Sequence, residues 1–312
     1  MAPTPEVTYC VVNTGQRELL MRGLDAIARE RESLPFETAV LVLDNASLDG
    51  SAEAARAHPV GAEVIALERR TAKALNDSEL LRRTRGRFSL LLNEDSELQP
   101  GATLALWGAL DGDARAACAG AALLRPDGRG QASAWRFPGV GAALLAAVGL
   151  ARVAVQSRGS ATREVDWCQS AAMLVRREAA AAIDWMDPAF FVYSDEVDFQ
   201  RRLRDAGWHM LWVPSARAIH HEQLSTGSVP ERRIVEMARN RDLYMHKHHG
   251  ALAALFVRVL SAWAYGARAL LALALPGHDA RRYWRHAVAS LRPGRGEGIR
   301  EAAERWNASR GV

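Results

Sequence analysis

The chain has 312 residues, 49% of them hydrophobic and 24% charged, which excludes wholesale disorder and allows one large α/β domain with a helical extension. Its cysteines, Cys10, Cys118 and Cys168, lie far apart without a CxxC pair, which argues against a disulfide framework and a structural zinc site. Lys and Arg number 21 against 27 Asp and Glu in residues 1–200, but 19 against 9 in residues 201–312. We therefore expect the acidic first part and the basic last part to meet different partners.

The first residues have no basic segment and no cleavage-site pattern, so we expect no signal peptide. The longest uncharged apolar run, residues 139–151, is shorter than the roughly 20 residues that span a bilayer. Together with the unpaired cysteines, these features predict a cytoplasmic protein.

Short apolar runs alternate with amphipathic segments over residues 1–125. We predict strands at 7–12, 39–43, 62–66, 88–92 and 116–123, and helices at 17–30, 50–57, 72–83 and 101–110. This alternation is typical of βαβ units, so the predicted fold class is α/β, with a Rossmann-like, mostly parallel sheet flanked by helices.

Residues 125–165 are rich in Gly, Arg and Ser and are interpreted as an excursion or flap. Beyond them we predict strands at 171–175, 190–193, 209–213 and 216–219, helices at 177–183 and 195–206, and helices from Pro230 to the end. The expected division is one domain over 1–228, with halves 1–125 and 126–228, and a C-terminal helical region over 229–312.

Polar clusters follow the second and fourth predicted strands. The first contains Asp44 and Ser47, and the second contains Asn93 and Asp95. Ligands of open parallel sheets bind at the carboxyl ends of strands, and carboxylates with oxygen-bearing neighbours suit Mg²⁺ or Mn²⁺, which in turn suits a diphosphate. The alternative is that Asp44 and Ser47 only cap the next helix.

Three carboxylates, Asp195, Glu196 and Asp198, open the helix predicted at 195–206. Crowded carboxylates raise one another's proton affinity, which suits a general base. The alternative is that they complement the helix dipole, with Asp198 and Arg202 forming an ion pair at i,i+4 spacing. A histidine pair follows the segment 216–219, and such a pair is more often structural than a metal ligand.

Taken in order, these clusters resemble the family 2 glycosyltransferases with a GT-A fold, the bacterial rhamnosyltransferases in particular, over roughly residues 5–250. The resemblance rests on the turn Val-Asn-Thr-Gly-Gln at 12–16, the run Asp-Asn-Ala-Ser at 44–47, Asn-Glu-Asp at 93–95, the segment 166–177, and the block 190–198. It also rests on the spacing of His220 and Ser225. Here Asn93 replaces the usual first aspartate of the metal motif. The usual Asn-x-Gly-Phe run before the third helix is missing.

The resemblance implies a role for each site residue. Asp95 and His220 hold Mg²⁺ or Mn²⁺, with His221 as a rival ligand. By position Glu196 is the base, with Asp195 as its rival because the usual Glu-Asp-x-Asp order is swapped. The donor-binding residues are Asn13, Gly15, Asp44, Ser47, Arg70, Lys73 and Asn93, and the acceptor-binding residues are Trp167, Gln169, Asp198 and Arg202.

The expected activity is metal-dependent, inverting transfer of a hexose or deoxyhexose from a dTDP- or UDP-sugar to an acceptor hydroxyl in bacterial cell-wall or surface-polysaccharide assembly. A lipid-linked saccharide acceptor fits the apolar segments 139–151 and 251–275, which with the basic tail are expected to lie on the inner face of the cytoplasmic membrane. The alternative is that they are ordinary core helices.

Two other functions stay open. A sugar nucleotidyltransferase would carry a glycine-rich loop near the first strand, where this chain has Asn-Thr-Gly-Gln-Arg. A non-catalytic protein that binds the membrane surface on the same fold is the second alternative. Nucleic acid is not an expected partner, because the basic residues are not interleaved with aromatic ones.

Overall fold

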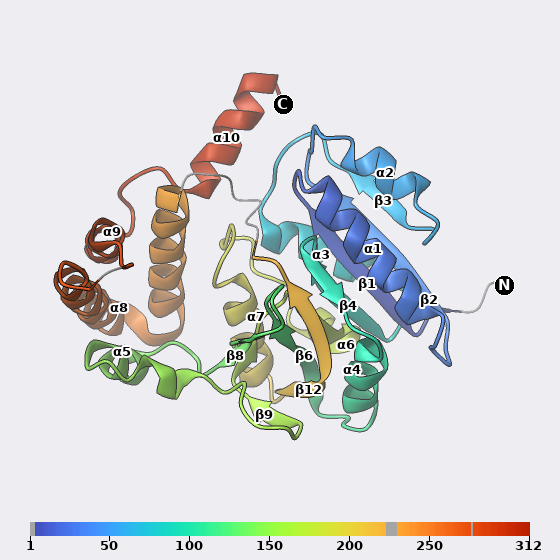
Figure 1. Ribbon diagram of the computed structural model, residues 1–312, viewed down its shortest axis with the longest axis horizontal. Helices are drawn as coiled ribbons and strands as arrows, with labels where there is room; N and C mark the ends of the chain where they lie inside the picture. Colours follow the sequence, from blue (N-terminus) through green and yellow to red (C-terminus); the bar gives the residue numbers. More distant parts are fainter. Residues whose placement is uncertain (1–3, 223–229, 276) are drawn as a thin grey trace.

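The computed structural model describes residues 4–222, 230–275 and 277–312 and is built around one large sheet (Figure 1). The main path of the sheet has the strand order β3-β2-β1-β4-β11-β6-β12-β5. The strands of this path are β1 Val7–Asn13, β2 Thr38–Asp44, β3 Glu63–Ala66, β4 Phe88–Asn93, β5 Ser96–Leu98, β6 Ala116–Leu124, β11 Ala172–Arg176 and β12 His209–His220.

Most neighbouring strands are parallel. Strands β3, β2, β1 and β4 run parallel to one another, and β12 runs parallel to β6. Strand β11 lies antiparallel between β4 and β6, and β5 lies antiparallel to β12. The predicted α/β class with a mostly parallel sheet is confirmed. Three-residue β5 was missed because so short a strand shows no hydrophobic period.

Two hydrophobic cores lie on the two faces of the sheet, because successive side chains of a strand point to opposite sides. In β1, Tyr9 and Val11 pack into one core, and Cys10 and Val12 pack into the other. The first core is covered by α1 Arg17–Arg31, α2 Ser51–Ala57 and α4 Ala102–Asp111. The second is covered by α3 Lys73–Arg83, α6 Arg177–Ala182 and α7 Asp195–Asp205.

The strand predicted at 190–193 is wrong. Residues 190–194 form a bent loop in which Tyr193 and Ser194 have φ angles of 68° and 60°, which no strand accommodates. The apolar character of the segment comes from Phe190, which is buried against Val197 and Tyr244. The two strands predicted at 209–213 and 216–219 are the single strand β12, interrupted by an irregular register after Val213.

The excursion contains small elements that extend the edge of the sheet and one helix packed away from it. Strand β7 pairs with β6, β9 pairs with β12, and β8 pairs with β10. Their bounds are β7 Gly130–Gln131, β8 Ala134–Trp135, β9 Arg163–Val165 and β10 Trp167–Cys168, and the helices are α5 Val140–Ala147 and the 3₁₀ helix Ala151–Ala154.

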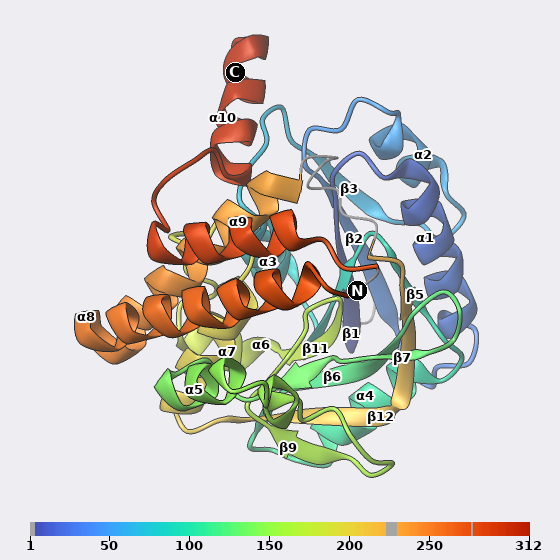
Figure 2. The same cartoon turned by 60° about the vertical axis from the view of Figure 1, so that its left-hand side comes forward.

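The C-terminal helices are α8 Pro230–Ala272, α9 Ala280–Leu291 and α10 Ile299–Arg310. Helix α8 is broken at Gly250, whose φ of 81° is left-handed, and its second part runs beside α9 and α5 (Figure 2). Helix α10 leads away from this group toward the loop after β3. The side chain of its Asn307 hydrogen-bonds to the backbone of Arg70 in that loop.

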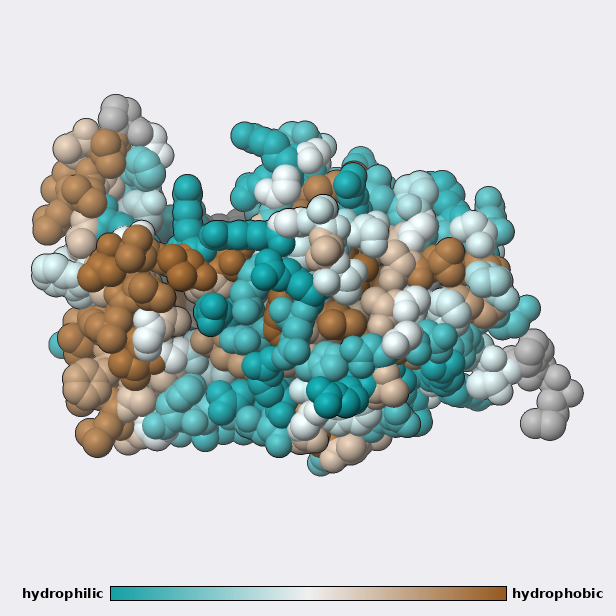
Figure 3. Space-filling model, turned by 90° about the horizontal axis from the view of Figure 1, so that it is seen from below, coloured by the Kyte–Doolittle hydropathy of each residue, from teal (hydrophilic) through white to brown (hydrophobic). Residues whose placement is uncertain are grey.

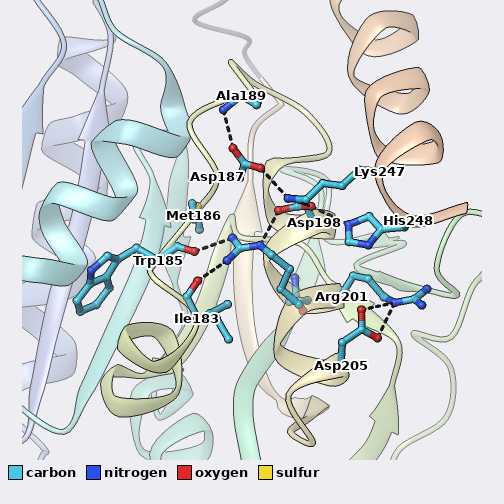
Figure 4. Close-up of polar contacts among 12 residues, drawn as sticks. Ile183, Trp185, Met186, Asp187, Ala189, Asp198, Arg201, Asp205, Lys247 and His248 are labelled. Carbon is cyan, nitrogen blue, oxygen red and sulfur yellow. Dashed lines mark hydrogen bonds and ion pairs between the residues drawn. The ribbon is translucent and has the colours of Figure 1, made fainter. Parts of the chain in front are cut away.

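A buried cluster of charges around Asp198 ties α7 to α8 (Figure 4). The Asp198 side chain is fully buried, and its Oδ2 accepts a hydrogen bond of 2.8 Å from Arg202 Nε. The His248 Nε2 and Lys247 Nζ atoms of α8 each lie 2.7 Å from its Oδ1. Arg202 also donates to the carbonyl oxygens of Ile183 and Trp185, at 2.6 Å each.

Replacing Asp198 should therefore destabilise the whole fold. Asp198→Ala leaves Arg202, Lys247 and His248 without their shared acceptor, so we expect unfolding free energy to fall by about 3 kcal/mol or more. The matched control is Asp205→Ala on the same helix, whose ion pair with Arg201 is half-exposed and contributes under about 1 kcal/mol. Urea denaturation of both variants measures the difference; equal losses would contradict a structural role for Asp198.

Candidate active site

Two adjoining cavities open at the carboxyl ends of β1, β2 and β4. The larger, of about 250 Å³, lies above these strand ends, and the smaller, of about 130 Å³, lies toward α7 and β12. Lys73, Asn93, Glu94 and Val192 line both, so the two cavities form one continuous cleft. This is the edge of the sheet at which the sequence predicted a site.

A hydrogen-bond network joins the turns after β1 and β2. Asn13 Nδ2 donates to Asp44 Oδ1 at 2.7 Å and to Ser47 Oγ at 3.1 Å. Ser47 N donates to Asp44 Oδ2 at 2.9 Å, and Gly15 N donates to Ser47 Oγ at 2.8 Å. Four of the predicted donor-binding residues thus lie together, with Asp44 only 2% exposed. The capping alternative is wrong, because α2 begins at Ser51 with Gly50 as its N-cap and no side-chain cap hydrogen bond.

The wall of the larger cavity at this end comes from Val12, Thr14 and Asn45. The sequence analysis did not name Thr14 and Asn45 as site residues, although each directly follows a predicted one, Asn13 or Asp44. Asn45 Oδ1 accepts a hydrogen bond of 2.8 Å from the backbone N–H of Thr71, which holds the loop after β3 against the cavity. The network is therefore a support that positions the lining residues.

Two predicted cations, Arg70 and Lys73, enter the cleft from that loop and from the start of α3. Lys73 Nζ donates to Asp77 Oδ2 at 2.5 Å and to Ser170 Oγ at 3.1 Å, and lies 3.9 Å from Asp195 Oδ2. Burial opposes its charge, but the neighbouring carboxylates of Asp77 and Asp195 outweigh burial and raise the pKa of Lys73. Lys73 therefore stays cationic where the two cavities meet.

Asp95 and His220 meet in the smaller cavity, as the sequence predicted. Their side chains are each 6% exposed, and His220 Nε2 lies 3.4 Å from Asp95 Oδ1. The other ring nitrogen, Nδ1, lies 3.2 Å from Gln131 Nε2, which holds the ring in place. The rival His221 lies 2.7 Å from Glu97 Oε1 instead, so the geometry favours His220 as the partner of Asp95.

Among the described residues, no group of three or more His, Cys, Asp and Glu side chains is placed to hold a metal ion. Asp95 and His220 offer one carboxylate and one imidazole, a ligand set that suits Mn²⁺ and leaves positions for phosphate oxygens and water. The donor chemistry and the adjacent, nearly buried side chains thus fit a divalent ion that is shared with a ligand.

Glu196 and Asp195 occupy different environments at the start of α7. Glu196 is half-buried and lines the smaller cavity beside Gln169 and Tyr193. Asp195 is 1% exposed, and neither of its carboxylate oxygens makes a hydrogen bond within the described part of the chain. Burial and the charge of Glu196 raise the pKa of Asp195.

The backbone before these carboxylates is strained. Tyr193 and Ser194 both have left-handed φ angles, although neither is glycine, and such conformations cluster at ligand-binding sites. The tight entry into α7 aims Glu196 into the smaller cavity, where the Arg233 guanidinium lies 5.6 Å from the Tyr193 ring. Tyr193 lies in the block 190–198 that carries the resemblance but was given no role, and no sequence pattern marks Arg233.

The predicted acceptor-binding residues lie in different parts of the structure. Gln169 lines the smaller cavity. Trp167 stacks on Trp135, with ring centroids 4.6 Å apart, and donates to the Arg136 carbonyl. Asp198 and Arg202 lie in the buried charge cluster between α7 and α8, with their polar atoms bonded within the protein, so their contacts favour a role in positioning α7 over contact with an acceptor.

Comparisons with known proteins agree with this arrangement. The pattern of the glycosyltransferase-like family 2 matches residues 4–242. The chain is 33% identical to an N-acetylglucosaminyl-diphospho-decaprenol L-rhamnosyltransferase of Mycobacterium tuberculosis over 87 residues. This aligned stretch covers 28% of each of the two chains. Over 57 residues it is 37% identical to a rhamnosyltransferase of Escherichia coli (strain K12), which is 18% of this chain and 22% of that one. The matches thus span under a third of these relatives.

Solved structures share the fold at low sequence identity. A mannosyltransferase of Pyrobaculum calidifontis in complex with GDP-mannose and Mn²⁺ aligns over 98% of this chain and 81% of its own, with a TM-score of 0.56 and 14% identity. GalNAc-T7 with UDP, GalNAc and Mn²⁺ aligns over 99% of this chain and 58% of its own, with a TM-score of 0.55 and 14% identity. With the family pattern matched over most of its length, the chain belongs to family 2 of the glycosyltransferases and has a GT-A fold.

Proposed function

We propose that the protein is an inverting glycosyltransferase that moves a sugar from a nucleotide-diphosphate sugar to an acceptor hydroxyl. The observation that carries the proposal is that Glu196 lines the same small cavity as the Asp95–His220 pair. A proton acceptor and a cation-binding pair thereby lie around one space. The adjoining larger cavity has room for the nucleoside, with Lys73 at the junction where a diphosphate would pass.

Glu196 is proposed as the general base. It removes the proton of the acceptor hydroxyl as that oxygen forms its bond to the anomeric carbon. The bond from the anomeric carbon to the diphosphate oxygen breaks, its electrons leave with the nucleoside diphosphate, and the anomeric centre is inverted. Asp195 lines the same cavity but is 1% exposed, and burial beside Glu196 raises the pKa of Asp195, so the more accessible Glu196 is proposed as the base.

Asp95 and His220 would hold the divalent ion, and Lys73 would add a second positive charge beside it. When bound, Mg²⁺ or Mn²⁺ supplies Lewis-acid stabilisation of the charge that builds on the leaving diphosphate. The Mn²⁺ present in the two similar solved structures supports this proposal.

The donor is proposed to be a dTDP- or UDP-sugar, with rhamnose as the preferred sugar. The names of the M. tuberculosis and E. coli relatives support a rhamnosyl donor. A lipid-linked saccharide is the proposed acceptor, since the M. tuberculosis relative is named for a diphospho-decaprenol acceptor. Bacterial cell-wall or surface-polysaccharide assembly is therefore the proposed setting of the reaction.

An exposed apolar surface supports a lipid-linked acceptor. Beyond Gly250, one side of α8 packs on the protein through Ala254 and Val257, while the other side exposes large side chains. Figure 3 shows apolar side chains gathered at one end of the molecule, where α5 and α8 lie in Figure 1. The exposed side chains of this apolar surface are Leu144, Val148, Leu252, Leu255, Phe256, Val259, Trp263, Leu270 and Leu271.

Of the described residues, one helix, Glu231–Ala272, is long and apolar enough to cross a membrane, and 17% of its most apolar window is buried. Its second part is held in the fold, because Arg258 bonds to Asp242 at 2.6 and 2.7 Å across the bend and Tyr265 stacks on His286 of α9. We therefore propose that it lies on the inner face of the cytoplasmic membrane, where the basic last third of the chain meets anionic lipid.

Glu196→Gln tests the base. The amide keeps the shape but accepts no proton, so we expect transfer to a lipid-linked N-acetylglucosamine to fall by about 10²-fold or more, with donor affinity within about twofold. Asp195→Asn is the matched control, because an amide mimics a neutral acid; it should keep most activity. A radiolabelled transfer assay and calorimetric donor titration measure both, and an inactive Asp195→Asn beside an active Glu196→Gln would move the base role to Asp195.

Asp95→Ala tests the metal-binding pair. With UDP-, dTDP- and GDP-sugars, each with and without Mn²⁺, one donor class should raise the melting temperature in a metal-dependent way, since ligand at 100 times its Kd stabilises by about 2.7 kcal/mol. Asp95→Ala should abolish that shift. Glu97→Ala, which removes the partner of His221, should keep it. An unchanged shift in Asp95→Ala would exclude this residue as the ligand.

Phe256→Glu tests the apolar surface, since Phe256 is 61% exposed. Burying a phenylalanine side chain stabilises by about 1.5–3 kcal/mol, so a charge there should weaken binding to anionic phosphatidylglycerol vesicles by about tenfold or more. Leu104→Glu on α4, outside the apolar surface, is the control and should bind as the wild type does. Flotation of the three proteins decides; failure of the wild type to float contradicts the membrane proposal.

A further inference from the structure

Helix α10 lines the larger cavity with one face. The cavity residues from this helix are Ile299, Ala302, Ala303 and Trp306, opposite Thr14 and Asn45 from the strand ends. We propose that α10 is a wall of the donor pocket and that Trp306 is a contact for the nucleoside. This inference rests on the proposed transferase function and deepens it, because the sequence placed the whole donor site in residues 13–93.

The N-terminus of α10 is anchored by a buried carboxylate of α8. Glu236 is fully buried, and its Oε2 accepts hydrogen bonds from the backbone N–H groups of Ile299 at 3.0 Å and Arg300 at 3.3 Å. A carboxylate there also suits the positive end of the helix dipole. Gly298 lies against the same carboxylate, which a Cβ at that position would strike. The direction in which α10 leaves α8 is thereby set.

Near its C-terminal end, α10 is hydrogen-bonded to the loop after β3, which carries Arg70. Asn307 is 3% exposed; its Oδ1 accepts from Arg70 N at 2.7 Å, and its Nδ2 donates to Arg70 O at 3.0 Å. A side-chain amide that pairs with both polar groups of one residue fixes the position of that residue. Anchored at both ends, α10 holds its cavity face in place over the strand ends.

The chemistry of this wall suits a nucleoside better than a phosphate. The Trp306 ring is half-buried, and the Arg70 guanidinium lies 4.4 Å from its centroid. Ile299, Ala302 and Ala303 add aliphatic surface. The Arg310 guanidinium lies 5.3 Å from the same centroid. An aromatic edge with aliphatic neighbours and flat guanidinium groups offers apolar contact for a planar base and donors for its carbonyl oxygens. Thr14 and Asn45, at the strand ends, line the same cavity and are proposed to supply polar groups for ribose.

Trp306→Ala is the test, with Trp284→Ala as the matched control, because Trp284 is a 60% exposed tryptophan on α9 away from the cleft. The probes are UDP, dTDP and GDP with Mn²⁺, and inorganic diphosphate with Mn²⁺, titrated by calorimetry into the full chain. We expect Trp306→Ala to weaken the preferred nucleoside diphosphate by about tenfold and leave inorganic diphosphate unchanged, since aromatic contacts with a base are worth about 1–3 kcal/mol. Trp284→Ala should match the wild type.

The outcomes of these titrations distinguish failure of the transferase proposal from failure of the α10 assignment. If the wild type binds none of the three nucleotides, the transferase proposal itself fails. If the wild type binds one and Trp306→Ala binds it equally well, only the assignment of α10 fails. Trp306→Phe, which retains an aromatic ring, should recover most of the affinity and serves if the alanine variant does not fold; full loss of affinity in a folded Trp306→Phe also overturns the contact.

Discussion

The buried carboxylate of Asp198 is the constraint on which the arrangement of the second half depends. It shares its two oxygens among Arg202 of its own helix and Lys247 and His248 of α8, so α7 and α8 cannot move independently. Two residues earlier on α7, Glu196 faces the cleft, and nearer the start of α8, Glu236 anchors α10. This charge cluster thus fixes the position of α7, which carries the proposed base, against α8, which in turn anchors α10 at the other end of the cleft.

The sheet supplies the remaining geometry. Parallel strands β1, β2 and β4 end at one edge, and the turns after them carry Thr14, Asn45 and Asn93 to the cavities. Strand β12 runs beside β6 and then crosses to β5, which brings His220 to Asp95. The cleft is therefore assembled from segments far apart in the chain, which the paired strands bring to one edge of the sheet.

Burial and neighbouring charges together shift the pKa values inside the cleft. Asp195 is withdrawn from water beside Glu196, which raises its pKa, while Lys73 keeps its proton among carboxylates. Water-poor surroundings strengthen such interactions, so Asp195, Glu196 and Lys73 are electrostatically linked within a small volume. None of the side chains named for the apolar surface around α8 lines either cavity, so the proposed lipid contact and the proposed transfer chemistry lie on different parts of the molecule.

The sequence by itself determined the class of fold, the strand-end clusters and the order of the motifs, because hydrophobic period and turn residues are local properties. Tertiary structure alone decided between rivals that local pattern cannot separate. His220 and His221 are neighbours, yet they meet Asp95 and Glu97 respectively. The sequence pattern assigns Asp198 to the site, but in the structure α8 buries its carboxylate. Trp306 and Asn307 carry no motif, and only the packing of α10 brings them to the cleft, since contacts between distant residues leave no period in the chain.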